Sequence, residues 1–229
     1  MNRNFPGLSV VFVLLLAALP ALAGDVVDRI VATVNGHIIL QSDWQDETRY
    51  EAFIEGRTVD QLESSDRKTA LDHLIDQELL REQMGSSSFA QTSPEQVEKR
   101  VQEIRKLHQN AVNELAWLTV LSQYGLTPES LKNRVVLQLD LEGLVDARLR
   151  PNVNIDSKSV ESYYNQELLP KLRQAGTQET PLAQVSGDIK ELLTQQKMNQ
   201  MLVAWLQDLR SGSEIRTVPG SPEAGVELR

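Results

Sequence analysis

The segment DHLIDQE, residues 72–78, carries side chains whose types and spacing could do chemistry. Asp72 and Asp76 are four residues apart, so a helix would place both carboxylates on one face. They could form a carboxylate pair, or bind a metal ion together with His73. The same spacing is also typical of the solvated face of an amphipathic helix, which is the more common case. We therefore expect neither a catalytic residue nor a metal ligand here.

The rest of the sequence lacks the usual catalytic constellations. The 229 residues include no cysteine, which excludes thiol nucleophiles, disulfides and cysteine-ligated metals. No nucleophile elbow, phosphate-binding loop, zinc-protease motif or dinucleotide fingerprint occurs. The three histidines, His37, His73 and His108, lie in the N-terminal half on different predicted elements. We expect no catalytic residues, no metal and no cofactor.

Residues 1–23 have the pattern of an export signal. Arg3 precedes an apolar stretch from Leu8 to Leu19, and Ala21-Leu22-Ala23 fits a cleavage site. The alternative is an uncleaved membrane anchor, but the apolar stretch is short for a span of about 20 residues. We expect cleavage after Ala23, a mature protein outside the cytoplasm, and no stable membrane insertion after signal removal.

The charge balance excludes one class of partner. The chain has 23 Lys and Arg against 32 Asp and Glu, and its formal net charge is −9. Such a protein repels phosphate backbones and anionic lipid surfaces. We expect no nucleic-acid partner.

The N-terminal region predicts a β-hairpin. In VVDRIVATVNGHIIL, residues 26–40, β-branched residues dominate, and Asn35-Gly36 is a strong signal for a type I′ turn. A helix should follow, with Ser42 as its N-cap in the capping box SDWQ. Because a two-stranded hairpin is marginal alone in water, a third strand is expected.

Apolar periodicity and capping residues predict a run of helices after the hairpin. Ser93 and Thr127 stand as N-caps, each followed by proline at the first helical position. The expected helices cover residues 43–55, 66–84, 94–107, 113–124, 128–150 and 153–169, with a loop over 170–180.

The C-terminal part predicts one long helix and a short strand. Thr180 and Pro181 begin an apolar stripe that continues to Gly212, and SEIRTV, residues 213–218, then has strand character. This strand is expected to complete the N-terminal hairpin. The predicted fold is mainly α, with residues 219–229 as a disordered tail.

These segments together resemble the SurA family of periplasmic chaperones. The matching stretches, identified by their order and spacing, are VVDRIVATVNGHIILQSDW, ALDHLIDQELLREQM, SPEQVEKRVQEI, YGLTPESLKNRVVLQL, VNIDSKSVESYY and IKELLTQQKMNQMLVAWLQDLRSGSEIRTV. The resemblance implies a single chaperone module over residues 24–218. Its N-terminal helical region would span 24–173, and its long helix and strand 180–218.

Members of that family usually carry an inserted parvulin-type prolyl isomerase domain. Here only the eight residues RQAGTQET lie between Leu172 and Pro181, which is too short for such a domain. The resemblance therefore implies a periplasmic, ATP-independent holdase that is not an enzyme. Its clients would be unfolded exported polypeptides, above all outer-membrane protein precursors, bound in an apolar crevice.

Five side chains are the candidates for lining that crevice. They combine aromatic or flexible apolar character with positions near predicted apolar stripes: Trp44, Met84, Trp117, Leu121 and Tyr124. Core packing is the competing interpretation for each of them. Two other functions stay open, a peptidyl-prolyl cis-trans isomerase and a structural partner of an envelope complex.

Overall fold

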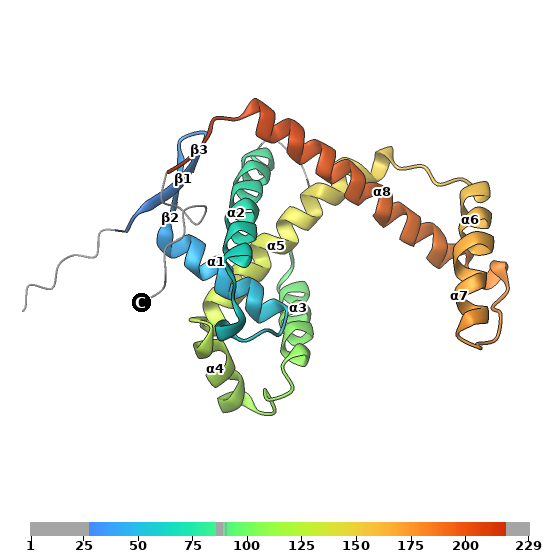
Figure 1. Ribbon diagram of the computed structural model, residues 1–229, viewed down its shortest axis with the longest axis horizontal. Helices are drawn as coiled ribbons and strands as arrows, with labels where there is room; N and C mark the ends of the chain where they lie inside the picture. The colour runs from blue at the N-terminus through green and yellow to red at the C-terminus, as the bar shows by residue number, and fades with distance from the viewer. Residues whose placement is uncertain (1–27, 86–88, 90, 219–229) are drawn as a thin grey trace, which may run out of the picture.

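The computed structural model describes residues 28–85, 89 and 91–218. The predicted export signal and the predicted C-terminal tail lie outside the described residues. Within them the protein is mainly helical, with one small antiparallel sheet that joins the two ends of the described chain (Figure 1). The predicted fold class is thus confirmed.

The sheet has the strand order β2-β1-β3, with β1 (Ile30–Val34), β2 (His37–Leu40) and β3 (Ile215–Thr217). Both pairings are antiparallel, and Thr33 lies opposite Arg216 in the second. Asn35 and Gly36 have φ values of 49° and 88°, as the predicted type I′ turn requires. The C-terminal strand therefore completes the hairpin as expected.

The Asn35 side chain adds a second connection between the hairpin and the C-terminal segment. The side-chain Oδ1 accepts a hydrogen bond from the Glu214 N–H at 2.8 Å, and the Asn35 backbone N–H donates to the Glu214 carbonyl at 2.9 Å. Its Nδ2 also donates to Glu82 Oε2 at 2.7 Å and to Ser213 Oγ at 3.2 Å. One turn residue thus contacts the end of the second helix and the segment before β3.

Five helices form the body of the molecule, with a 3-10 turn at Val59–Gln61 between the first two. They are α1 (Gln41–Ile54), α2 (Ser64–Met84), α3 (Pro94–Leu107), α4 (Glu114–Gln123) and α5 (Pro128–Leu149). Ser93 and Thr127 cap α3 and α5 as predicted. The prediction for Ser42 is wrong, because β2 runs directly into α1. Leu40 is the N-cap, and its N–H donates to the Asp43 carboxylate.

A long helix, α8 (Leu182–Gly212), crosses the body and extends beyond it (Figure 1). Its far end packs against α6 (Ser157–Tyr163), which follows α5 after a 3-10 turn at Arg150–Asn152. The chain continues from α6 through a π-helical turn, Tyr164–Leu168, into α7 (Leu169–Gln174). The predicted loop over 170–180 is therefore too long, since helix persists to Gln174.

The part of α8 near its C-terminus is fixed to the body by apolar and ionic contacts. Met198 and Trp205 are buried in a cluster with Leu80 of α2 and Leu144 of α5. At the end of α8, Arg210 reaches α2. Its Nε donates to Asp76 Oδ1 at 2.6 Å, and its Nη1 and Nη2 donate to the Asp72 carboxylate and carbonyl at 3.3 and 2.9 Å.

Deleting residues 213–229 should lower the free energy of unfolding by about 3 kcal/mol or more. The deletion removes the β1–β3 pairing, the contacts of Asn35 with Ser213 and Glu214, and the packing of Ile215 on the sheet cluster. Deleting only residues 219–229 retains every one of these contacts and is the matched control. Urea unfolding of both proteins measures the difference, and equal midpoints would contradict a stabilising role for β3.

Candidate functional site

An open cavity of about 1010 Å³ lies between α1, α2, α5 and α8. The segment before α3 and its first turn close a further side. The cavity is at the upper end of the range of about 300–1,000 Å³ that is common for ligand sites. Because its walls come from five separate segments, its shape depends on how α8 is held against the body.

One part of the cavity wall is apolar. It is formed by side chains of α2, α5 and α8 that belong to, or pack on, the buried cluster around Trp205: Leu80, Leu137, Leu141, Val145, Met198 and Leu202. Leu80, Leu141 and Met198 are buried, while the other three are only partly buried. This surface can take up apolar side chains of a ligand with little loss of water from polar groups.

Amide side chains stand beside this apolar surface. Gln77, Gln91 and Asn199 line the cavity and form no side-chain hydrogen bond with the described residues. An amide offers two donors and an acceptor, which match the carbonyl and N–H groups of a peptide backbone. The cavity can therefore bind apolar side chains and main-chain polar groups at the same time.

An ion pair between α5 and α1 forms another part of the cavity wall. Arg134 Nη1 lies 2.5 Å from Glu47 Oε2, and the Arg134 guanidinium carbon lies 4.8 Å from the centre of the Tyr50 ring. Glu47 is buried, so the pair is a fixed part of the wall rather than a mobile surface contact. Burial, and secondarily the Glu47 charge, raises the pKa of Tyr50 to about 12, so the phenol stays neutral.

A second polar pair lies on α1 and α2. Glu51 Oε1 is 2.5 Å from His73 Nδ1, and both side chains line the cavity. Burial raises the pKa of the Glu51 carboxyl above its usual range, and the hydrogen bond to His73 only partly offsets this effect. The ionised carboxylate is thus incompletely stabilised by its neighbours.

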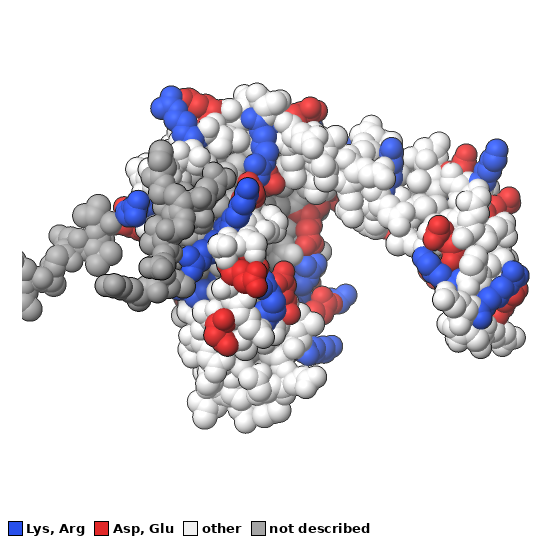
Figure 2. Space-filling model, in the orientation of Figure 1, with Lys and Arg blue, Asp and Glu red and all other residues white. Residues whose placement is uncertain are grey.

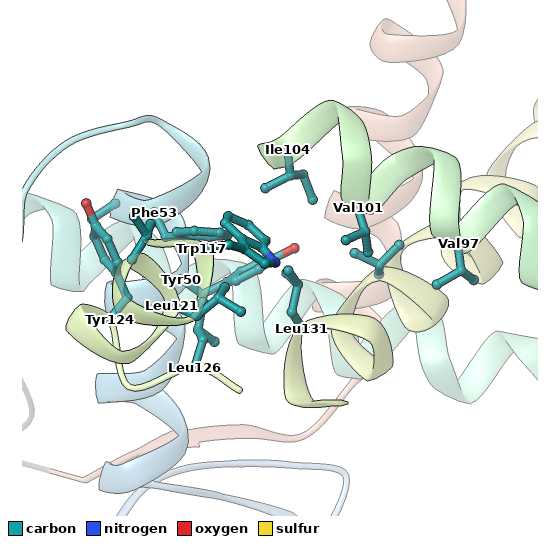
Figure 3. Packing of buried hydrophobic residues seen from close by; sticks show 13 residues of the cluster. Tyr50, Phe53, Val97, Val101, Ile104, Trp117, Leu121, Tyr124, Leu126 and Leu131 are labelled. Carbon is teal, nitrogen blue, oxygen red and sulfur yellow. The ribbon is translucent and has the colours of Figure 1, made fainter. Parts of the chain in front are cut away.

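The structure places the five sequence-predicted site residues away from the cavity. Trp117, Leu121 and Tyr124 are buried between α1, α3, α4 and α5 in the cluster that also contains Phe53 (Figure 3), and the Trp117 and Tyr124 ring centroids lie 5.9 and 5.3 Å from that of Phe53. Trp44 is buried beneath the sheet, and its Nε1 donates to the Arg67 carbonyl at 2.7 Å. Met84 packs on the α5–α8 cluster without lining the cavity. Their role in peptide binding stays a prediction, but the burial of the other four, and the position of partly buried Met84 outside the cavity, remove the geometric reason for it.

The possible carboxylate pair or metal site on α2 has a structural role. Asp72 and Asp76 both bind Arg210 and thereby join α2 to the end of α8, while His73 faces Glu51 in the cavity. Within the described residues no group of three or more His, Cys, Asp or Glu could hold a metal ion. No described helix is long and apolar enough to cross a membrane.

A helical body closed by a terminal sheet, with an open cavity that combines apolar and amide side chains, fits a chaperone-type, polypeptide-binding domain. The sequence matches the model of the SurA-like N-terminal domain over residues 4–145, more than half of the chain. The chain therefore belongs to this family, and membership supports a chaperone-type function in which the protein binds client polypeptides. A search among curated proteins found no match.

Trp117→Ala should lower the free energy of unfolding by about 3–5 kcal/mol, because it opens a cavity beside Phe53 and Leu121. Leu115→Ala on the same helix is the matched control. Leu115 is 76% exposed, and its truncation should change stability by no more than about 0.5 kcal/mol. Chemical denaturation measures both. A Trp117 variant of unchanged stability with lost client binding would restore Trp117 as a binding residue.

The environment of His108 predicts that the free energy of unfolding falls in acid. Its ring stacks on Phe53 at 4.5 Å between centroids, and its Nε2 is buried with no hydrogen-bond partner among the described residues. Burial lowers the pKa of His108 in the folded protein, although a hydrogen bond with the Phe53 backbone opposes the shift. The unfolded chain, with a pKa near 6.5, therefore binds the proton more readily.

The stability that neutral His108 contributes should be fully present above pH 6.5, the pKa of the unfolded chain. It should be lost as the pH falls through the lower pKa that His108 has in the folded protein. His108→Phe keeps a ring at this position but cannot titrate. Between pH 7 and 5 the wild type should lose more stability than the variant, as measured by urea unfolding at each pH. Parallel pH curves for the two proteins would show that His108 does not contribute.

Proposed function

We propose that the protein is an ATP-independent holdase that binds extended segments of unfolded exported polypeptides in the cavity. The proposal rests on the apolar surface around Leu141 and Met198. Beside it lie three amide side chains that form no side-chain hydrogen bond with the described residues. A segment bound there would bury its apolar side chains and pair part of its backbone. Binding to the unfolded state slows client aggregation without an energy source.

The disorder of the client limits the expected affinity. A disordered client loses conformational entropy when it is ordered, so binding to one cavity should be on the order of micromolar. Weak binding suits a holdase, because the client must leave in order to fold.

The setting and the clients of the holdase form a second part of the proposal. The export-signal pattern of residues 1–23 and the membership of the SurA-like family support a periplasmic location. Outer-membrane protein precursors are the proposed principal clients, because they must remain unfolded until they reach the membrane.

We also propose that the protein is not a prolyl isomerase. Between the end of α7 at Gln174 and the start of α8 at Leu182 the chain has only a short connection. A protease-coupled assay on an X-Pro peptide should show only the uncatalysed rate, with times of tens to hundreds of seconds. Acceleration proportional to protein concentration would overturn this part of the proposal.

The purified protein should suppress aggregation of a denatured outer-membrane barrel protein at near-stoichiometric ratio without nucleotide. Asn199→Trp should abolish most of this effect, because the indole would occupy space in the cavity that Asn199 lines and would remove one amide. Gln200→Trp is the matched control, since Gln200 is the next residue on α8 and is exposed outside the cavity. Light scattering measures aggregation, and circular dichroism checks that both variants fold.

The two variants separate the possible outcomes. Equal loss of protection in both would mean that clients do not bind in this cavity. If the wild type protects no exported client, the holdase proposal fails. In that case a dedicated role in an envelope complex becomes the better explanation, and one stoichiometric partner should be recovered from periplasm.

A further inference from the structure

The ionisable side chains around the cavity are unequally distributed. Five carboxylates line it, against one guanidinium and one imidazole: Glu47, Glu51, Glu55, Glu142 and Asp146, with Arg134 and His73. Acidic excess alone would reflect only the net charge of the chain. The partners of each carboxylate decide whether the excess is neutralised locally.

Three of the carboxylates form ion pairs with arginines, and each of these arginines also pairs with a second carboxylate. Arg57 binds Glu55 at 2.6 Å and also Asp66 at 3.0 Å. Arg100 binds Glu142 at 3.0 Å and also Glu103 at 3.6 Å.

Arg150 completes this set, since it binds Asp146 at 2.6 Å and Glu191 at 3.2 Å. Counted by its ion pairs among the described residues, each of these three groups has two carboxylates for one arginine, and therefore a net charge of −1.

The remaining two carboxylates differ from each other. Glu47 has Arg134 to itself, so that pair is neutral. Among the described residues Glu51 pairs with His73, and no arginine or lysine forms an ion pair with it. Because burial leaves the Glu51 carboxylate incompletely stabilised, a cation brought by a ligand would supply the missing interaction. The wall formed by α1 and α2 is therefore the place where a basic side chain gains most.

We infer that the cavity selects client segments in which apolar residues are accompanied by lysine or arginine, and discriminates against segments that carry Asp or Glu. The apolar surface on α5 and α8 takes the apolar side chains, while Glu51, Glu55 and Glu142 attract the cation. This inference rests on the proposed function, because it names the substrate class of the same cavity. Binding should accordingly have an electrostatic component in addition to apolar burial.

Three labelled peptides test the inference on the full-length mature protein. They share the same apolar residues and differ at two positions, which are both Lys, both Gln or both Glu. At low ionic strength the Lys peptide should bind about tenfold more tightly than the Glu peptide, with the Gln peptide between them. Raising the salt concentration should reduce this ratio, because the charges around the cavity are partly exposed.

Variants of the protein locate the selectivity. Glu51→Gln with Glu142→Gln should reduce the ratio between the Lys and Glu peptides to near unity. Glu55→Gln with Glu142→Gln changes only exposed side chains and should reduce the ratio in part. This second double variant tests the inference even if a change at half-buried Glu51 disturbs folding. Glu161→Gln removes one charge from an exposed position on α6, outside the cavity, and should leave the ratio unchanged.

The outcomes distinguish the inference from the proposed function. Equal affinity for all three peptides, or a ratio that survives both double variants, overturns the inference while the holdase proposal stands. If the Gln peptide does not bind at all and Asn199→Trp changes nothing, the proposed function fails as well.

Discussion

The pairing of β1 with β3 is the constraint on which the rest of the structure depends. Three residues of β3 hold the C-terminal end of α8 against the sheet, and Asn35 and Arg210 fix the same end to the hairpin and to α2. From there α8 is directed across α2 and α5 and on to α6 (Figure 1). Because α8 supplies one wall of the cavity, the small sheet, together with the Trp205 cluster and Arg210, sets the position of that wall.

Local signals in the sequence predicted most of the fold, because their physics is local. The Asn35-Gly36 turn and the caps at Ser93 and Thr127 each act within four residues and were confirmed. The prediction failed where tertiary context decides. Ser42 lies inside α1 because the preceding strand leaves no room for a separate cap, and helix continues through Pro170, which is tolerated near the start of α7.

The candidate site could not be predicted in the same way. Aromatic side chains such as Trp117 are natural candidates for a binding site in a sequence, but they also contribute most to the packing of a small core. The cavity is instead lined by glutamines, glutamates and leucines from five segments, whose types are ordinary for solvated helices. Figure 2 shows acidic and basic side chains next to one another in the middle of the body. The ion pairs of Arg100 with Glu142 and of Arg150 with Glu191 join residues about 40 positions apart, so the charge balance around the cavity follows from the fold and not from local sequence.

Asn35 and β3 stand at opposite ends of the described chain, and a ribosome makes the first of them long before the second. During synthesis the hairpin emerges early with one edge of β1 unpaired, and it keeps that open edge until residue 217 has appeared. A product that ends anywhere before β3 retains the open edge permanently and lacks the contribution of β3 to holding α8. The hairpin edge is therefore covered only when synthesis of the chain is complete. Unfinished copies keep an open strand edge that finished copies lack, and proteases can recognise this difference.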